Sequence, residues 1–417
     1  MAPETRNLIA AMSLSLAILI GWQLYIVEPE LQADRAAYEA QQQAQQNQTS
    51  TTAERLQMDL GVGQAAEDTV AQDLGIRITI ETPQLTGSFS TMGGSLDDVV
   101  LKGYLETQND QANQIHLFKR FDSEHPYLAG FGWLAGEPTI LPDEKTVWQA
   151  SGNTLTPNTP ITLTFDNGEG LVFSRKISVD EDYLLTIDDN VFSNRSNAIK
   201  LSPYSYLRRT GMPETLGLFI VHEGPIGFFG DGGTKEVDYD DLHEKKEEFN
   251  PETNGGWIGF SDHYWLATLM PKQSEQMAKY QMQSYVKLTN TGNVRVYQTD
   301  IQGDYMLLRP GEEISWQMHL YAGSKKLTSL DKYENELQIE KFDKAIDFGY
   351  LFFLTKPFFY AISWLFSFLG NFGLAIVAFT IVVRLALFPL ANKSYKSMAK
   401  MRHLAPKIQQ MREDYGD

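Results

Sequence analysis

Residues 372–390 read Phe372-Gly-Leu-Ala-Ile-Val-Ala-Phe-Thr-Ile-Val-Val-Arg-Leu-Ala-Leu-Phe-Pro-Leu390, nineteen residues with one hydroxyl and one charge. As a helix rising ~1.5 Å per residue, this stretch is about 29 Å long, close to the ~30 Å hydrocarbon core of a bilayer. A basic run follows it at once, at Lys393, Lys396, Lys400 and Arg402. The stretch therefore predicts a membrane span, 372–390, whose carboxyl end faces the cytoplasm.

The single charge in this span is Arg384, and Thr380 lies four residues before it on the same helix face. An arginine near mid-membrane costs roughly 2.5 to 3.5 kcal/mol on insertion scales, so it marks a candidate functional position. Two interpretations are open. Arg384 is six residues from Leu390 and can extend its head group to the cytoplasmic interface. Alternatively, its face contacts water or a polar partner inside the membrane.

Several motifs around this span resemble one known family, the YidC-type membrane protein insertases. They are Asn371-Phe-Gly, Thr380-Ile-Val-Val-Arg384, Phe388-Pro389-Leu390, Ser397-Met-Ala-Lys-Met401 and Pro406-Lys-Ile-Gln-Gln-Met-Arg412. The resemblance covers the family's second core span and the start of its first cytoplasmic loop. It implies that Arg384 lies in a water-filled groove, open to the cytoplasm and the inner leaflet, which receives substrate segments, and that Thr380 lines this groove.

A second apolar run, Leu8 to Val27, is also long enough to span a bilayer. It exceeds the usual ~7 to 15 apolar residues of a signal peptide, and Glu28-Pro29-Glu30 follows where small cleavage-site residues would be expected. We therefore expect an uncleaved signal anchor at 8–27, after a cytoplasmic segment 1–7. The Gln-rich stretch 28–73 lacks apolar periodicity and predicts a flexible linker.

The charge distribution indicates which side of the membrane each part faces. The chain carries a net charge of -18, yet residues 391–417 hold six Lys/Arg against three Asp/Glu. The positive-inside bias places both termini in the cytoplasm and residues 28–371 outside, which the resemblance identifies as the periplasm of a multi-pass inner-membrane protein. An acidic body argues against nucleic-acid binding. The chain has no cysteine, which excludes disulfides and thiolate metal sites.

Between the two spans, residues 74–330 alternate with a period of two, as in Ile76–Ile80, Ile161–Phe165 and Leu171–Val179. The sequences 166–170 and 290–293 contain residues that tolerate positive φ and predict hairpin loops. The expected fold is thus two transmembrane helices flanking a large antiparallel β-sandwich. The resemblance implies a β-supersandwich periplasmic domain, similar to sugar-binding and mutarotase folds.

No motif for bond chemistry stands out in this domain. Imidazole adjoins carboxylate at, for example, His222-Glu223, His243-Glu244 and Asp262-His263, and neighbouring residues of a strand point to opposite faces. The glycine-rich run 224–233 lacks the Lys-Ser/Thr of a phosphate loop and is expected to be an ordinary loop. The acidic residues 231–241 lack EF-hand spacing. We expect no catalytic residue, no metal site and no cofactor.

Residues 331–369 return to a helical period and are rich in aromatics, with Lys356-Pro357 in their middle. A third crossing there would place the basic tail outside, so we expect a broken amphipathic helix in the outer interface. Residues 391–417 predict the start of a basic cytoplasmic helical hairpin. Its methionine-rich stripe suits apolar targets, and resting on anionic lipid is the alternative role. The candidate contacts are Lys400, Arg402, Lys407 and Arg412.

These observations lead to the hypothesis of a membrane protein insertase and chaperone that is not an enzyme. A hydrophilic cationic groove would aid insertion, folding and assembly of inner-membrane proteins, alone or with the Sec translocon. Expected partners are nascent inner-membrane proteins with acidic tails, the Sec translocon, membrane lipids and, further, the ribosome. The family has three more spans after the point where this sequence ends. The alternative function is a membrane-anchored carbohydrate-binding or mutarotase-like β-sandwich, recognisable by a concave cluster of aromatic and carboxylate side chains.

Overall fold

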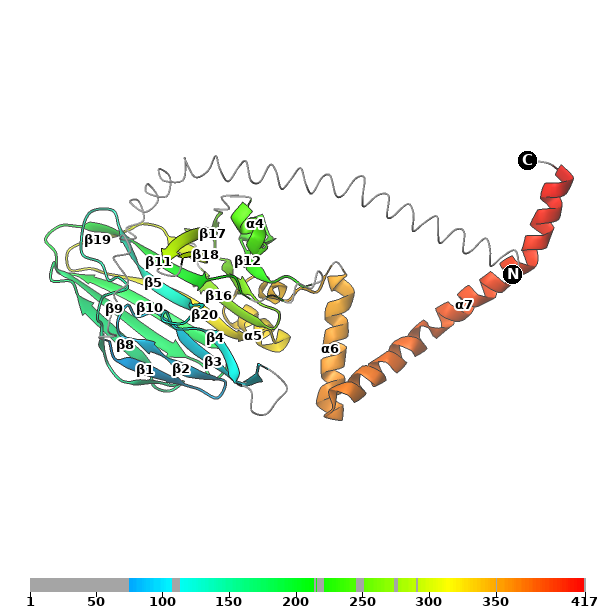
Figure 1. Ribbon diagram of the computed structural model, residues 1–417, viewed down its shortest axis with the longest axis horizontal. Helices are drawn as coiled ribbons and strands as arrows, with labels where there is room; N and C mark the ends of the chain where they lie inside the picture. The colour runs from blue at the N-terminus through cyan, green and yellow to red at the C-terminus, as the bar shows by residue number, and fades with distance from the viewer. Residues whose placement is uncertain are drawn as a thin grey trace.

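The computed structural model describes residues 75–106, 113–213, 215, 221–244, 251–273, 277–289, 292–349 and 351–415, shown in Figure 1. Near the carboxyl end, at 399, 400 and 402–415, this description covers the backbone alone. The predicted signal anchor 8–27, the linker 28–73 and the cytoplasmic segment 1–7 lie outside the described residues.

The strands of the described residues form three sheets. One has the order β4-β3-β2-β1-β7, the second β13-β12-β15-β16-β20-β10-β9-β8-β6, and the third β14-β17-β18-β11-β19 with β5 paired to β11. Neighbours are antiparallel except β1 and β7. The bounds are β1 Arg77–Glu81, β2 Leu85–Ser90, β3 Asp98–Leu105, β4 Gln114–Phe118, β5 Tyr127–Ala135, β6 Gln149–Ala150, β7 Thr154–Leu155, β8 Ile161–Asp166, β9 Leu171–Val179, β10 Leu184–Ser193, β11 Ile199–Thr210, β12 Gly224–Phe228, β13 Thr234–Glu236, β14 Glu252–Asn254, β15 Trp257–Ser261, β16 Trp265–Pro271, β17 Met277–Thr289, β18 Gly292–Gly303, β19 Met306–Leu308 and β20 Glu313–Ser324.

The alternation predicted from the sequence is confirmed in the strands that it marked. Leu171–Val179 is β9, and it pairs with β8 through the hairpin at 166–170, where Gly168 and Gly170 have positive φ. β17 and β18 form the second predicted hairpin, although its two linking residues are not described. The glycine-rich run 224–233 is not simply a loop: its first half is strand β12, buried throughout, and a single 3-10 turn, η2 (Gly230–Gly232), follows.

The core lies between the nine-stranded sheet and the other two sheets. Along β20 the even-numbered side chains Met318, Leu320 and Ala322 face this core and are buried. From the opposite layer, Tyr127 of β5 packs edge-on against Phe260 of β15, with 5.9 Å between ring centroids. Helix α4 (Tyr239–Glu244) closes one end, where the Tyr239 ring stacks on Phe260. The expected large antiparallel sandwich is therefore present.

The segment after β20 differs from the expected interfacial helix. Helix α5 (Leu327–Glu336) and the 3-10 turn η3 (Phe342–Ala345) pack on the outer face of the nine-stranded sheet, where the Tyr321 ring lies 5.8 Å from Tyr333 and 5.6 Å from Phe342. Tyr333 and Phe342 are fully buried, so residues 331–346 pack with the sandwich. The sequence shows their apolar character but not the sheet face that covers them.

Helix α6 (Phe352–Leu369) is one unbroken helix, although a break at Lys356-Pro357 was expected. Pro357 stands in its second turn and removes only one backbone donor near an end that already has several unsatisfied donors. Gly370, in the left-handed conformation, ends the helix, with its N–H bonded to the Phe366 carbonyl. Asn371 then caps the next helix, α7 (Phe372–Tyr415), by accepting a hydrogen bond from the Leu374 N–H at 3.1 Å.

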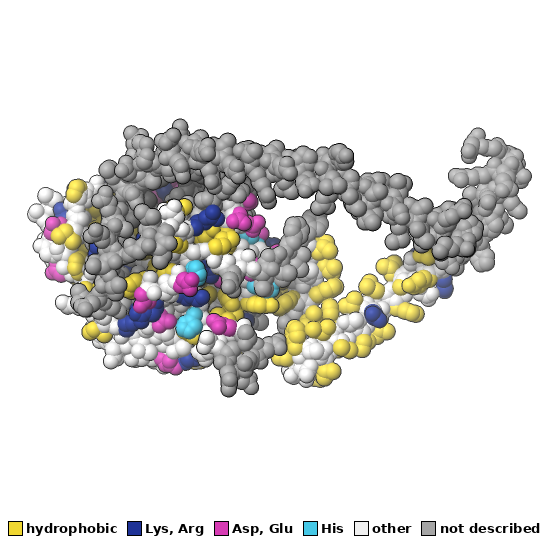
Figure 2. Space-filling model, viewed as in Figure 1, with side chains coloured by type: hydrophobic (Ala, Val, Ile, Leu, Met, Phe, Trp, Pro, Cys, Tyr) yellow, Lys and Arg dark blue, Asp and Glu magenta, His cyan; other side chains and the backbone are white. Residues whose placement is uncertain are grey.

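Helices α6 and α7 meet at this tight turn and diverge from it, away from the sandwich (Figure 1). Ring contacts hold them together, Phe358 to Phe379 at 5.0 Å and Phe366 to Phe372 at 5.7 Å. Hydrophobic side chains cover much of the face of α6 and of the first part of α7 that Figure 2 shows, and both helices are long and apolar enough to cross a bilayer. The predicted helix at 372–390 is confirmed as part of α7.

Candidate functional site

Thr380 and Arg384 both lie on α7, within its apolar part. The Thr380 hydroxyl donates to the carbonyl of Ile376 at 2.8 Å, which satisfies it within its own helix, as is usual for hydroxyls in apolar helices. Arg384 is exposed, and the described part of the chain offers it no hydrogen bond or ion pair. The two side chains are four residues apart and therefore share one helix face.

The surroundings of Arg384 are apolar. Val382, Leu385 and Phe388 are all more than half exposed, and none of them contributes a polar atom. A guanidinium has five N–H donors and no acceptor, so this face of α7 can bind anions or water but cannot neutralise its own charge. The arrangement suits a cation that is exposed to water or to an acidic ligand.

The four candidate cytoplasmic contacts lie on the last part of α7, where the backbone alone is described. Their side chains, those of Lys400, Arg402, Lys407 and Arg412, lie outside the described residues. The helix continues through Pro406 to Tyr415. The predicted hairpin itself extends beyond what the structure describes.

A polar cluster that the sequence analysis missed joins α6 to the β domain, and we call it the α6 joint. Its members are Asp331 of α5, Asp343 of η3, and Lys356 and Tyr360 of α6. The Lys356 Nζ lies 2.5 Å from Oδ2 of Asp343 and 3.7 Å from Oδ1 of Asp331. The Tyr360 hydroxyl donates to Oδ2 of Asp331. The i, i+4 spacing of Lys356 and Tyr360 shows in the sequence that the two side chains share a helix face. It does not identify their acidic partners, which belong to other elements.

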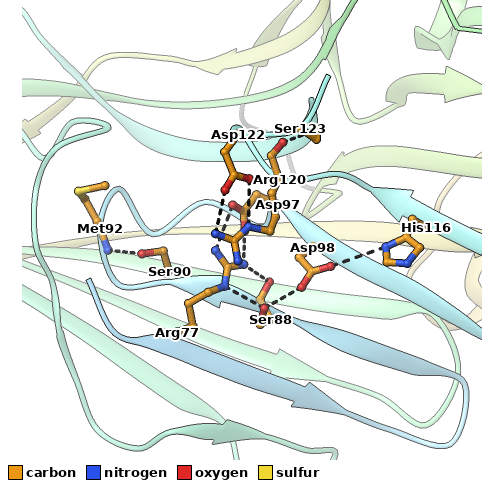
Figure 3. Close-up of polar contacts among 10 residues, drawn as sticks. All are labelled: Arg77, Ser88, Ser90, Met92, Asp97, Asp98, His116, Arg120, Asp122 and Ser123. Atoms are coloured by element: carbon orange, nitrogen blue, oxygen red, sulfur yellow. Dashed lines mark hydrogen bonds and ion pairs between the residues drawn. The ribbon is translucent and has the colours of Figure 1, made fainter. Parts of the chain in front are cut away.

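Figure 3 shows a polar network on β1 to β4 that contains a serine, an aspartate and a histidine. The Ser88 hydroxyl donates directly to Oδ2 of Asp98 at 2.7 Å, and His116 Nδ1 lies 4.0 Å from Oδ1 of the same carboxylate. In a nucleophilic triad the serine must reach the imidazole instead. Beside it, Arg77 forms hydrogen bonds to both Asp97 oxygens, at 2.7 and 3.3 Å. Burial raises the pKa of the Asp97 carboxyl, and Arg77 opposes that shift. This network links strands.

The histidine–carboxylate neighbours named in the sequence analysis do not converge either. Asp262 forms two hydrogen bonds with Arg209, at 2.6 and 2.8 Å. His222 Nε2 lies 3.0 Å from the Pro225 carbonyl oxygen, and its Nδ1 lies 3.4 Å from Asp238. The His243 side chain is not described. Among the residues that the structure describes, no group of three or more His, Asp or Glu side chains is arranged to hold a metal ion.

An open hollow of about 620 Å³ lies on the outer face of the nine-stranded sheet. It is lined mainly by polar side chains, namely Lys176, Asp188, Asn190, Lys272, Ser315 and Gln317, with Trp316. Trp316 is only 8% exposed, so its ring offers a ligand little surface. The hollow lacks the aromatic platform that the carbohydrate-binding alternative requires, and that alternative gains no support from it.

Comparison with known proteins gives two family matches. Residues 77–361 match the family described as the YidC periplasmic domain, and residues 364–417 match the 60Kd inner membrane protein family. A relative named membrane protein insertase YidC from Beijerinckia indica is 38% identical over 432 residues, covering 100% of this chain and 70% of its own length. A relative of the same name from Brucella melitensis is 36% identical over 436 residues, covering 99% and 70%.

Among solved structures, a galactose mutarotase related enzyme from Lactobacillus acidophilus is similar to the β domain. Its TM-score is 0.40 and its identity 10%, over 59% of this chain and 97% of that one. A likeness at this level says nothing about sugar chemistry in this chain. The matches to insertases, which cover all or nearly all of this chain, are the informative ones.

Proposed function

Since the chain belongs to the YidC family of membrane protein insertases, we propose that Arg384 and Thr380 form the polar face of a groove that receives substrate segments. The protein is a membrane insertase with a periplasmic β-sandwich domain. The observation that supports the proposed role is a single guanidinium, exposed and without a partner among the described residues, within the apolar part of α7. A charge kept in such a place indicates function rather than stability.

The physical task of an insertase is to move a polar tail across hydrocarbon while an apolar segment enters the lipid. A hydrated cationic face on α7 shortens the apolar path and attracts acidic residues of the tail. A membrane potential negative inside then drives each acidic charge outward, by about 2.3 kcal/mol per 100 mV. No bond needs to be made or broken in this process.

We further propose the membrane arrangement. Residues 8–27 form the first crossing, residues 28–371 lie in the periplasm, and α7 returns the chain to the cytoplasm through 372–390. Helix α6 then lies in the outer interface, because a third crossing would place the basic residues after Leu390 outside. The exposed aromatic side chains of α6, such as Trp364 and Phe368, favour that interface.

The substrates of this insertase are membrane proteins, and we propose that acidic tails are the part that Arg384 attracts. Lys400, Arg402, Lys407 and Arg412 are proposed to contact substrates, anionic lipid or the ribosome on the cytoplasmic side. Cooperation with the Sec translocon is part of this proposal.

The test is charge reversal in the full-length protein. Arg384→Glu is expected to impair the insertion of a substrate with an acidic tail, measured by protease protection of that tail in membrane vesicles. The same substrate with its acidic residues changed to Asn and Gln is the matched control, and its insertion should fall less. Arg384→Lys should retain most activity, because the role needs charge rather than a fork of donors. Normal insertion of the acidic substrate by Arg384→Glu would refute the role of Arg384.

A further inference from the structure

The α6 joint connects the first three turns of α6 to elements that pack on the β-sandwich. Asp331 belongs to α5 and Asp343 to η3, and both elements are fixed on the sandwich by the buried side chains Leu330 and Phe342. The Asp343 N–H also donates to the Glu334 carboxylate at 3.0 Å, which ties η3 to α5. The two carboxylates are therefore held in place by the β domain and form an acidic binding site for Lys356.

On the helix side, the contacts lie along one face of α6. The Lys344 Nζ lies 3.9 Å from the centroid of the Phe352 ring. The Thr355 hydroxyl donates to the Phe348 carbonyl at 2.9 Å, and the Phe348 and Phe359 rings are 6.3 Å apart. With Lys356 and Tyr360, these contacts recur at the three- to four-residue spacing of a helix face. A simple flexible tether between a domain and a membrane helix would need none of them.

The next contact carries this geometry to α7. Phe358, between the two α6 members of the joint, packs edge-on against Phe379 with 5.0 Å between ring centroids. Phe379 directly precedes Thr380 in the sequence. A change in the direction of α6 relative to the domain would therefore move the helix that carries Thr380 and Arg384.

The α6 joint also limits how deep α6 can lie. Two carboxylates and an ammonium are costly in hydrocarbon, so the joint stays on the water side of the interface. A partly exposed ion pair is weak in bulk water, but the low dielectric of a neighbouring bilayer strengthens the attraction between opposite charges. The pair is thus suited to hold a helix at that boundary.

We propose that Lys356 is a positioning residue: by binding Asp343 and Asp331 it holds α6 at a fixed angle to the β domain, and through Phe358 and Phe379 it sets the position of the Thr380–Arg384 face. The periplasmic domain then acts as a brace for the insertion groove. The functional half of this inference rests on the role proposed for Arg384, whereas the geometric half does not.

The geometric half is tested by distance measurement in the full-length protein in lipid nanodiscs. The chain has no cysteine, so Glu336→Cys and Ser367→Cys place one spin label on the domain and one on α6. We expect a narrow distance distribution by double electron–electron resonance. Lys356→Met should broaden it, and Lys356→Arg should restore it. The control is Lys332→Met, which removes another lysine of this region: among the described residues, Lys332 pairs with Asp182 at 3.0 Å and lies over the Tyr333 ring, and neither residue belongs to α6. Superimposable distributions for Lys356→Met and the parent protein would overturn the proposal.

The functional half is tested by insertion of the acidic-tailed substrate. Lys356→Met is expected to reduce insertion several-fold and Lys356→Arg to rescue it, while Lys332→Met leaves it unchanged. One outcome separates the two proposals: Lys356→Met broadens the distance distribution yet inserts substrate normally, while Arg384→Glu blocks insertion. In that case the proposed effect of the periplasmic domain on insertion is refuted, and the proposed role of Arg384 is retained. If Arg384→Glu inserts normally, the groove is refuted, and the distance measurement alone decides for or against the joint.

Discussion

Arg175 and Asp189 form a two-bond ion pair inside the β-sandwich, with Nε to Oδ1 at 2.7 Å and Nη2 to Oδ2 at 3.0 Å. Arg175 is completely buried, and its guanidinium lies 5.1 Å from the Trp148 ring centroid and 5.5 Å from that of Phe131. The pair joins β9 to β10, and through these rings it reaches the facing layer. A buried charge of this kind is tolerable only while its partner is present.

Removing one partner of this pair should therefore be severe. Asp189→Ala leaves the Arg175 guanidinium buried without a counter-charge and should lower the free energy of unfolding by roughly 3 to 5 kcal/mol. The measurement is urea unfolding of the full-length protein in detergent, followed by tryptophan fluorescence. The double variant Arg175→Met with Asp189→Leu is the control, because it removes both charges; it should be more stable than the single variant. Equal stability of Asp189→Ala and the parent would contradict the argument.

Gly259, on β15, lies so close to the backbone of a neighbouring strand that we expect no larger residue to fit there. A Cβ added there would lie 1.9 Å from the carbonyl oxygen of Ala267 on the neighbouring strand β16. Because the obstacle is backbone, it cannot rotate away, and Gly259→Ala should destabilise the domain by about 3 kcal/mol. Gly132→Ala is the matched control, since nothing lies within 4 Å of the added atom. Thermal unfolding by circular dichroism should show a lower midpoint for the first variant only.

The contrast between these residues and the strands shows what the sequence can predict. Alternation in Leu171–Val179 identifies a strand and its buried face, because the side-chain period is set locally. The partner of Arg175 cannot be identified from such a local pattern. In the sequence, a buried arginine also cannot be told from an exposed one. Tyr333 and Phe342 were likewise assigned to an interfacial segment, since their burial depends on Tyr321 from a strand of the sandwich. Lys356 appeared only as part of the Lys356-Pro357 pair in the middle of an expected broken helix, while its binding partners lie 13 and 25 residues earlier. The local sequence pattern thus predicts helices and strands, whereas the α6 joint depends on contacts between residues far apart in the sequence.

Burial of Asp300 predicts a pH-dependent stability. Asp300 lies among Gln298, Gln283 and Tyr204 of the third sheet, and its Oδ2 accepts hydrogen bonds from the two amides at 3.1 and 2.8 Å. Burial raises the pKa of this carboxyl from 3.8 to about 6, against those hydrogen bonds. The folded state thus binds the proton more tightly than the unfolded state, so this group stabilises the fold at low pH, and the stabilisation disappears as the pH rises through about 6. Asp300→Asn should be more stable than the parent at pH 8, by about 3 kcal/mol, and about equal near pH 4.

His319 predicts the opposite dependence over the same range. It lies on β20, with Nδ1 3.1 Å from the Thr186 hydroxyl, and burial lowers its pKa from 6.5 to about 4, while the carboxylate of Asp188 opposes that shift. The folded state here holds the neutral imidazole, so the stabilisation is present above pH 6.5 and is lost as the pH falls toward 4. In the parent protein, Asp300 and His319 therefore change the free energy of unfolding with pH in opposite directions. Of these two groups only Asp300 titrates in His319→Gln, which keeps a hydrogen-bonding group, so this variant should gain stability relative to the parent as the pH falls from 6.5 to 4. Urea unfolding at pH 4.5, 6 and 8 measures this change in stability. In the double variant with Asp300→Asn, the contribution of these two groups to the pH dependence of stability should be nearly absent. A parent-like pH profile in His319→Gln would show that the imidazole is accessible to protons in the folded state.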